Sequence, residues 1–377
     1  MPEHIQKHFG RLLIVSDTAM YKVGPTARAF GPVVHELEYI SDLFSEINWI
    51  GYNQPQLADN SILKIINCQH LHIHPLQSVG GNTFKDKLYV LARVPGMLYL
   101  IYKRVKQADV IHTRGPSVPA LIAICLSFIL RKKIWWHKYA GNWSEPNPPL
   151  AYRLQRWLLS KLTHTYVTIN GQWPNQQPHL LSFENPCLYE TLTQVLPKSS
   201  TQNRYIICYV GALNDKKGLP EIIGMLNDPA IRSRISTCYI VGDGPPKDRY
   251  QAQLVNQTNV VFTGYLGKDE VNIILKQSHF IILPSHSEGF PKVIAEAAAF
   301  GTVPIVSDVS CIGQYITPDK GYLWQPGESL PAVVNKALSA SSEVYTSMSV
   351  QVNSLAPKFT YTYFKQQLIS RILQHAG

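Results

Sequence analysis

The sequence has few of the residue groupings that hold metals or disulfides. Its six cysteines lie far apart in the chain, and none belongs to a Cys-x-x-Cys pair or to a Cys/His ligand set. His72 and His74 have the spacing of a strand, but no third ligand accompanies them. We therefore expect free thiols in a reducing compartment and no metal centre.

Long apolar runs and a Gly-x-Gly-x-x-Gly turn are also missing. The most apolar segment, 118–130, is shorter than the roughly 20 residues that cross a bilayer. The first residues carry charges and lead directly into an apolar strand, unlike a signal peptide. The first turn, 17–25, contains Gly24 alone, which argues against a dinucleotide site there. These absences predict a cytoplasmic chain without a membrane span.

Positive charge is in excess. Lys and Arg number 35 against 25 Asp and Glu, a net charge of +10, and most of the excess precedes residue 190. Such a balance is typical of proteins that meet nucleic acid, an anionic membrane or an anionic substrate. Because no nucleic-acid motif accompanies the charge, we expect no nucleic acid partner.

One basic segment, 80–106, interleaves lysines and arginines with apolar residues. A basic amphipathic helix of this kind can lie on an anionic membrane. Pro95 and Gly96 interrupt the pattern, however, and a pair of ordinary surface helices fits it as well. Two interpretations stay open: peripheral contact with the inner face of the cytoplasmic membrane, or a solvated surface.

Short apolar segments alternate with helical patterns along the whole chain, which is typical of parallel sheets covered by helices. After the first strand, the turn 17–25 is expected to lead into a helical stretch that carries Arg28, His35 and Leu37. The predicted strands of the two halves are 12–15, 48–52, 63–66, 71–74, 109–112, 133–136 and 165–169, then 205–210, 238–241, 260–262, 279–283 and 303–306.

A short polar segment with a proline, 194–204, has the composition of a linker between the halves. The predicted fold class is α/β, with two Rossmann-like doubly wound domains. We place the N-terminal domain at 1–195 and the C-terminal domain at 196–355. Residues 356–377 are predicted to form a helix that packs back toward the N-terminal domain.

The stretch 279–308 carries the clearest chemical signal. It reads as a strand, a polar loop, a helix that starts near Pro291, and a second strand. The N–H groups at a helix start suit a phosphate, and Glu288 and Glu296 stand seven residues apart around it. The alternative is that Glu296 pairs with Lys292 at i, i+4 and that Glu288 is an ordinary loop carboxylate.

Other predicted strands also end in loops with polar chemistry. In the second half these loops are 211–218, 242–245 and 263–266, and Lys217 is placed to reach a diphosphate, unless it is a solvated turn lysine. In the first half the strand ends carry His112 and Arg114, then His137 and Trp143. His137 is either catalytic or a satisfied structural histidine, and Trp143 either stacks on a sugar or fills a core.

Together these residues resemble the retaining glycosyltransferases of family four, which have the GT-B architecture of two facing Rossmann-like domains with a cleft between them. The resemblance covers nearly the whole chain. Its most specific motif is the E-x7-E pattern of Glu288 and Glu296. Three further motifs support it, in family order: 211–218, 241–245 and 262–264.

The resemblance implies a role for each site residue. Glu288 would hold hydroxyls of the donor sugar, Glu296 those of the ribose, and Lys217 would neutralise the leaving diphosphate. His137 would lie near the reacting centre. The remaining donor-binding residues implied are Gly289 and Phe290, whose amides would hold the diphosphate, with Pro291, Gly211, Gly242, Gly264, Tyr265 and Leu266, the last three beside the nucleobase.

The sequence departs from the family at Ala212, where the family has an arginine. A second cation for the diphosphate would then come from elsewhere, with Arg28, Lys138 and Lys216 as the candidates. No cofactor and no divalent metal are implied, and the chain has no Asp-x-Asp triplet.

The resemblance implies transfer of a sugar, with retained anomeric configuration, from a nucleotide-sugar donor to a glycan or lipid-linked acceptor in cell-surface polysaccharide synthesis. A uridine diphosphate sugar is the preferred donor. Two alternatives stay open. A nucleotide-sugar epimerase would isomerise the donor without an acceptor, and a non-catalytic protein would bind the sugar nucleotide without transfer or hydrolysis.

Overall fold

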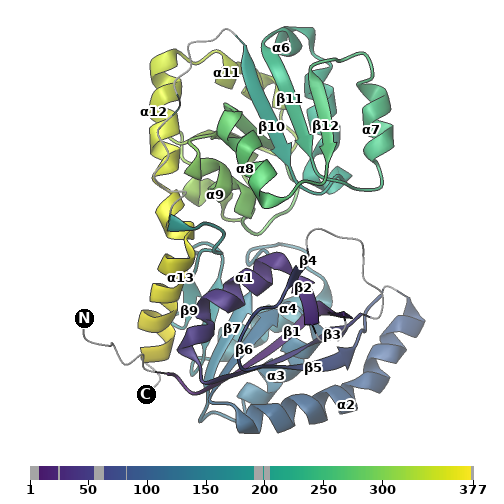
Figure 1. The fold of residues 1–377 in the computed structure, drawn as a ribbon, viewed down its shortest axis with the longest axis vertical. Coiled ribbons are helices and arrows are strands. Elements are labelled where there is room, and N and C mark those ends of the chain that lie inside the picture. The colour runs from purple at the N-terminus through teal and green to yellow at the C-terminus, as the bar shows by residue number, and fades with distance from the viewer. Residues whose placement is uncertain are drawn as a thin grey trace. The chain divides into compact units, whose positions relative to one another are not determined.

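The computed structural model describes residues 8–23, 26–54, 63–81, 83–190, 198 and 204–374. The chain forms two compact units (Figure 1). Unit 1 comprises Met1–Phe183 and Lys365–Gly377, and unit 2 comprises Glu184–Phe364. The units therefore divide about a dozen residues before the predicted boundary at 195, and the predicted linker 194–204 lies almost entirely outside the described residues.

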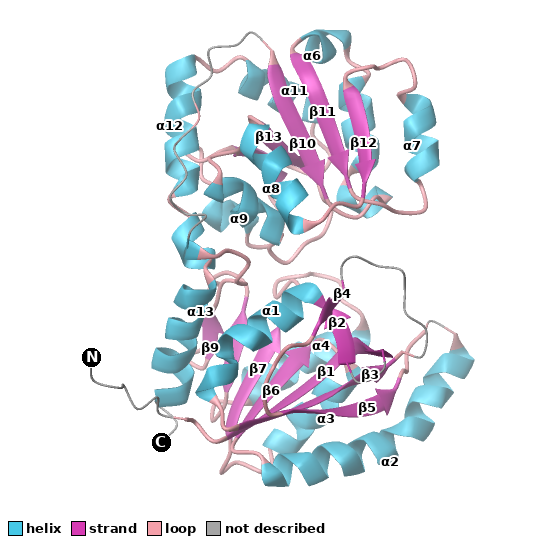
Figure 2. Ribbon diagram, viewed as in Figure 1, coloured by secondary structure: helices cyan, strands magenta, loops and turns pink. Residues whose placement is uncertain are grey.

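Unit 1 is built on a nine-stranded mixed sheet (Figure 2). Its centre is β1 (Arg11–Val23), which pairs in parallel with β3 (Glu46–Asn53) on one side and β6 (Val110–Gly115) on the other. The remaining strands are β2 (Thr26–Phe30), β4 (Leu63–Ile65), β5 (Leu71–Gln77), β7 (Ile134–Tyr139), β8 (Tyr166–Ile169) and β9 (Leu180–Ser182).

Three helices cover one face of this sheet: α2 (Phe84–Gln107), α3 (Val118–Ser127) and α4 (Leu150–Lys161). The middle one, α3, contacts both of its neighbours. Buried side chains of α2 and α3 share one apolar cluster with β1, β3 and β6, and those of α3 and α4 share a second with β7 and β8. This apolar packing holds β6 and β7 in place, and these strands carry the predicted site residues His112, Arg114 and His137.

The predicted turn after the first strand is wrong, whereas the predicted helix is confirmed for His35 and Leu37 and wrong for Arg28. β1 continues through 16–23 and pairs antiparallel with β2, with Tyr21 opposite Arg28. Arg28 therefore belongs to a strand, and α1 begins only at Gly31 (Gly31–Ile40). Pro32 lies in the first turn of α1, where its missing N–H costs no hydrogen bond of the helix and its fixed φ suits the helical conformation.

The predicted interruption at Pro95 and Gly96 is also wrong, since α2 is one helix of 24 residues. Proline removes one backbone hydrogen bond of the helix. Two features compensate. A capping box joins Thr83 and Asp86 at the start of the helix, and Met97, Ile101 and Val105 are buried in its second half.

Unit 2 is built on a parallel six-stranded sheet in the order β12-β11-β10-β13-β14-β15. The predicted strands of this half are confirmed, with shifts of a few residues at their ends, and helices alternate with them as expected. Sequence reasoning missed β15 at the sheet edge. The strands are β10 (Tyr205–Val210), β11 (Ile235–Val241), β12 (Val260–Gly264), β13 (Phe280–Leu283), β14 (Val303–Ser307) and β15 (Tyr322–Trp324).

Helices surround this second sheet (Figure 2). Those that matter for the site follow strand ends: α5 (Leu219–Leu226), α7 (Lys247–Gln253), α8 (Lys268–Gln277) and α9 (Lys292–Ala299). The others named below are α11 (Leu330–Leu338) and α12 (Ser342–Asn353).

The C-terminal segment belongs to both units. Helix α13 (Tyr361–Leu368) continues into the π-helix η5 (Ile369–Leu373). Within unit 1, Lys365 Nζ donates to Asp42 Oδ2 at 2.6 Å, and Arg371 Nη1 donates to the carbonyl of Ser182 at 2.9 Å. These contacts tie residues 365–374 to the first unit.

Candidate functional site

The polar loops of unit 2 meet at the centre of its sheet. β10 begins the sheet, β11 and β12 follow on one side of it, and β13 returns to pair on its other side. The order of the strands therefore reverses between β10 and β13. In open parallel sheets this switch point, at the carboxyl ends of the strands, is where ligands bind.

The two loops at the switch point are locked together. The N–H of His286, after β13, donates to the carbonyl of Lys216, after β10, at 2.9 Å. Gly218 has a φ of +78° and lies against the backbone of Pro284, so that a Cβ at 218 would be 2.1 Å from the Pro284 oxygen. Only glycine fits this close approach.

This lock brings together two of the predicted residues. Lys217 Nζ donates to Glu288 Oε1 in a short ion pair, and both side chains retain some exposure. The backbone N–H of Lys217 donates to Asn214 Oδ1 at 3.1 Å, which closes the turn that carries it. A cation and a hydroxyl-accepting carboxylate are thus held side by side, although 71 residues separate them in the chain.

Two helix N-termini flank the pair. α5 begins directly after Gly218, and α9 begins after Pro291, which is its N-cap. The first N–H groups of a helix have no carbonyl partner within it and attract an anion. The predicted donor loop precedes α9, and the ring of Phe290 is buried there, 4.7 Å from Tyr315 and 4.9 Å from Phe359 by ring centroids. This packing fixes the backbone of Gly289 and Phe290.

A buried hydroxyl lies at the start of the same loop. Ser285 is almost fully buried, and within the described part of the chain its Oγ has no hydrogen-bond partner. An unsatisfied buried hydroxyl is costly unless another group completes it. Ser285 stands two residues after β13, in the loop that carries Glu288, and sequence reasoning gave it no role.

The second predicted carboxylate, Glu296, lies inside α9. Its Oε1 is 3.3 Å from Lys268 Nζ at the start of α8. Lys268 also donates to the carbonyl of Cys187, and Lys292 Nζ donates to the carbonyl of Pro186 at 2.8 Å. The lysine that the structure places beside Glu296 is therefore Lys268, which comes from another helix and could not be identified by spacing within α9.

The loops after β11 and β12 complete the edge of the sheet. The Gly211 N–H donates to Val241 O at 3.0 Å, and the Gly242 N–H donates to Gly264 O at 2.8 Å, so each loop is fastened to the next. Tyr265 is exposed, and Leu266 is partly buried beside it. Lys247 Nζ lies 3.4 Å from Asp243 Oδ2 in the same group of loops.

Unit 1 carries its own charged cluster at the carboxyl ends of β6 and β7. Glu36 of α1 is almost fully buried, accepts from Arg114 Nη1 at 2.7 Å and pairs with Lys138 Nζ at 2.9 Å. His112 stacks on Trp136, and its pKa is well below the ordinary value because of burial and the charge of Arg114. Sequence reasoning identified Arg114 and His112 but missed Glu36.

His137 does not lie with this cluster. Its side chain has 0% exposure, its Nδ1 is 2.8 Å from Thr113 Oγ1, and its Nε2 has no partner among the described residues. Burial lowers the pKa of His137 to about 3, with smaller contributions from His164 and His179. A fully buried imidazole does not reach a substrate in this conformation, so its catalytic role stays a prediction.

Two of the three candidates for the second cation beside the diphosphate lie in unit 1. Lys138, one candidate for the second cation, is committed to Glu36, and Arg28 lies in β2. Among the described residues no cluster of three or more His, Cys, Asp or Glu could hold a metal ion. No helix in the described part of the chain is long and apolar enough to cross a membrane.

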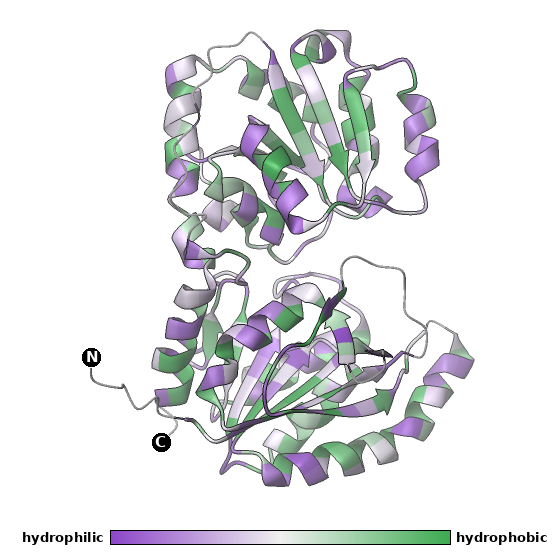
Figure 3. Cartoon of the chain, viewed as in Figure 1, coloured by the Kyte–Doolittle hydropathy of each residue, from purple (hydrophilic) through white to green (hydrophobic). Residues whose placement is uncertain are grey.

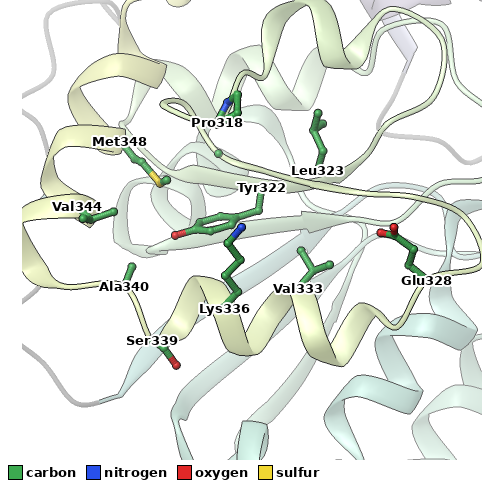
Figure 4. A pocket seen from close by; sticks show the side chains of 11 residues that line it. Pro318, Tyr322, Leu323, Glu328, Val333, Lys336, Ser339, Ala340, Val344 and Met348 are labelled. Carbon is green, nitrogen blue, oxygen red and sulfur yellow. The ribbon is translucent and has the colours of Figure 1, made fainter.

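A separate cavity of about 690 Å³ opens at β15, between α11 and α12 (Figure 4). Most of its lining is apolar, and Lys336 and Glu328 supply the charged groups. β15 is the edge strand, two strands away from β13. The cavity is therefore not the candidate site. Its wall includes Tyr322, Leu323, Val333, Val344 and Met348.

Residues 194–351 match the family model described as glycosyl transferases group 1. This match covers every unit 2 loop described above. This segment, which is less than half of the chain, is therefore similar to the glycosyl transferases group 1 family.

Curated relatives agree with this family. Over 127 residues the chain is 35% identical to the O-antigen chain mannosyltransferase C of Escherichia coli, covering 32% of this chain and 33% of the relative. It is 22% identical over 261 residues to the 2-deoxystreptamine N-acetyl-D-glucosaminyltransferase of Niallia circulans, covering 60% and 64%. The chain spans only a third of the first relative and 54% of a putative glycosyltransferase from Acidianus filamentous virus 2.

Solved structures show that this chain has the GT-B fold of two Rossmann-like α/β units. The Anabaena protein HepE, in complex with UDP and glucose, superposes with a TM-score of 0.67 at 15% identity, covering 96% of this chain and 98% of HepE. The sucrose-phosphate synthase of Thermosynechococcus elongatus gives 0.66 at 16% identity, covering 98% and 100%. The fold class expected from the sequence is confirmed.

Proposed function

We propose that this chain is a retaining glycosyltransferase, which moves a sugar from a nucleotide-sugar donor to a glycan or lipid-linked acceptor in cell-surface polysaccharide synthesis. The observation that carries the proposal is the Lys217–Glu288 pair at the switch point of unit 2, between the N-termini of α5 and α9. Positive charge for a diphosphate and a carboxylate for sugar hydroxyls are thereby held at one place.

In the proposed reaction the bond between the anomeric carbon and the diphosphate oxygen breaks as the acceptor oxygen bonds to the same carbon. The acceptor proton passes to the leaving diphosphate, so atoms and charge balance. Lys217, the backbone N–H groups of Gly289 and Phe290, and the N-terminus of α9 stabilise the charge that develops on the diphosphate. Because these groups supply the positive charge, the proposed step uses no divalent metal and no cofactor.

The other residues bind the donor. Glu288 accepts hydroxyls of the sugar, and Glu296, next to Lys268, accepts those of the ribose. Gly264, Tyr265 and Leu266 lie beside the nucleobase, with Gly211 and Gly242 forming the floor near the phosphates. Uridine is the proposed base, supported by the HepE complex with UDP. The O-antigen relative, and a putative teichuronic acid glycosyltransferase from Bacillus subtilis, support a surface polysaccharide as the product.

The test is donor turnover followed by proton NMR, with UDP-glucose and UDP-N-acetylglucosamine. We expect slow hydrolysis of the donor to UDP and free sugar, with the α anomer of the sugar appearing first. The variants Lys217→Ala and Glu288→Gln should hydrolyse the donor about a hundredfold more slowly, or more slowly still. Lys276→Ala and Glu343→Gln, which change exposed residues outside the site, serve as matched controls.

Three results would contradict the proposal. Isomerisation of the donor sugar without UDP release indicates an epimerase. Nucleotide binding without any turnover, also in the presence of polysaccharide acceptors, indicates a binding protein. Equal rates in the wild type and in both site variants show that the turnover arises elsewhere.

A further inference from the structure

Helix α2 carries an apolar stripe that none of the described residues of unit 1 covers. Seven of its large apolar side chains are exposed, and three of them reach 67% or more: Phe84 at 75%, and Leu91 and Tyr99 at 67%. The first half of the helix contributes almost nothing to the core, in which only Met97, Ile101 and Val105 of α2 are buried. The exposed residues are Phe84, Leu88, Tyr89, Leu91, Leu98, Tyr99 and Tyr102.

Most of these side chains share one side of the helix. Phe84, Leu88, Leu91, Leu98 and Tyr102 follow each other at i, i+4, i+7, i+14 and i+18, the spacing of one face. The core-facing residues form a second line roughly 100° around the axis. The exposed stripe is therefore a separate face, and not the edge of the hydrophobic core. Figure 1 shows α2 at the outside of unit 1, and Figure 3 shows apolar segments along it.

Basic residues surround the stripe, and acidic ones are nearly absent. Six lysines and arginines lie in α2 against one carboxylate, Asp86, which is used in the capping box. Two of the basic groups lie over aromatic rings of the same helix: Arg93 is 5.0 Å from the Tyr89 centroid, and Lys106 is 5.2 Å from the centroid of Tyr102, which belongs to the stripe. Long basic side chains and tyrosines at the border of an apolar face suit the headgroup layer of a membrane.

A second helix on the same face of the sheet repeats the pattern. α4 is separated from α2 by α3 and has no acidic residue. Leu150, Leu154 and Trp157 are exposed along one side of it, next to Arg153 and Lys161. The apolar and basic character thus extends across a layer of helices.

We propose that the exposed stripe of α2 binds the surface of an anionic lipid bilayer, with the helix lying in the plane of the headgroups. The charge of α2 favours a membrane over a second copy of this chain and over a different protein. A second copy of the chain, docked by the same face, would oppose the same lysines to one another. A protein interface of this kind would seldom carry so many lysines, which are depleted at interface cores.

The test is co-flotation of the full chain with vesicles, of phosphatidylcholine alone or with about one-third phosphatidylglycerol. We expect binding to the anionic vesicles only, weakened by salt. The double variant Leu91→Ser/Tyr99→Ser should bind on the order of tenfold more weakly. The double variant Lys85→Gln/Lys103→Gln should lose about fivefold in affinity for the anionic vesicles for each lysine removed.

Val255→Ser/Ile273→Ser is the matched control, because it removes two similarly exposed apolar side chains from unit 2, and it should float like the wild type. Sedimentation without lipid should give a monomer for every variant. Binding of the α2 variants at the wild-type level, no binding to anionic vesicles, or a dimer that the α2 variants abolish would each overturn the proposal. No donor or acceptor is present, so the outcome is independent of the proposed transfer.

Discussion

Single residues explain why the site is built from distant parts of the sequence. Lys217 lies on the turn after β10 and Glu288 on the loop after β13, and only the reversal of strand order brings them together. Each has an ordinary interpretation in the sequence, as a turn lysine and a loop carboxylate. The E-x7-E spacing identified both carboxylates, but it gave no sign of Lys268 beside Glu296 or of Ser285.

His137 leads to a prediction about stability. Burial depresses its pKa to about 3, below the value near 6.5 of an unfolded chain. Between these values the unfolded state binds a proton that the folded state does not, so stability is complete above pH 6.5 and falls as the pH falls toward 3. The expected slope from this one group is at most about 1.4 kcal/mol per pH unit.

Urea unfolding of the wild type and of His137→Gln at pH 7, 6, 5 and 4 measures that slope. Between pH 6 and pH 4 the unfolding free energy of His137→Gln should fall less steeply than that of the wild type, whatever the stability of the variant at pH 7. His72→Gln, which changes an exposed histidine of the same unit, should keep the wild-type slope. If His137→Gln declines as steeply as the wild type, the buried imidazole is not the group responsible.

At the scale of elements, Gly218 joins the turn after β10 to the loop after β13. In Gly218→Ala a left-handed residue would acquire a Cβ against the Pro284 carbonyl, with no space for it. We expect a loss of about 1–3 kcal/mol in unfolding free energy and weaker nucleotide binding, because Lys217 and Glu288 separate. Chemical unfolding and calorimetric titration with UDP measure the two effects.

Gly224→Ala is the control for this prediction. Gly224 lies inside α5, where a Cβ would meet nothing within 4 Å, so alanine should stabilise the protein by about 0.5–1 kcal/mol and leave nucleotide binding unchanged. A Gly218→Ala protein as stable as the wild type, with the same affinity, would show that the two loops are not locked as described.

Some strands and helices could be predicted from local sequence patterns, and others could not. Five of the six strands of unit 2 were predicted, because they read as short apolar runs between helical patterns, and β13 and β14 are buried on both faces. The three-residue edge strand β15 was missed. The β1–β2 hairpin was missed because its strands are partly exposed and lack such a run. The continuity of α2 through Pro95 was missed because tertiary burial of its second half, absent from any local pattern, outweighs one lost hydrogen bond.

At the scale of the whole molecule, chemistry is distributed unequally between the two units. Unit 2 holds the diphosphate-suited loops, and its strand order alone predicts where they meet. Unit 1 holds a buried cluster of Glu36, Arg114 and Lys138 at its own strand ends, together with the basic helix α2. The buried Glu36 could not be predicted, since a lone glutamate on a helix gives no sign that two cations from neighbouring strands surround it.

The central claim is that unit 2 binds a nucleoside diphosphate through Lys217. Thermal unfolding of the whole chain with the diphosphates of uridine, guanosine, adenosine and cytidine tests it most directly. A ligand at a hundred times its Kd adds about 2.7 kcal/mol of stability. We predict a clear rise in Tm with UDP and a much smaller rise in Lys217→Ala, whereas no rise with any of the four nucleotides, or an equal rise in the variant, would contradict the claim.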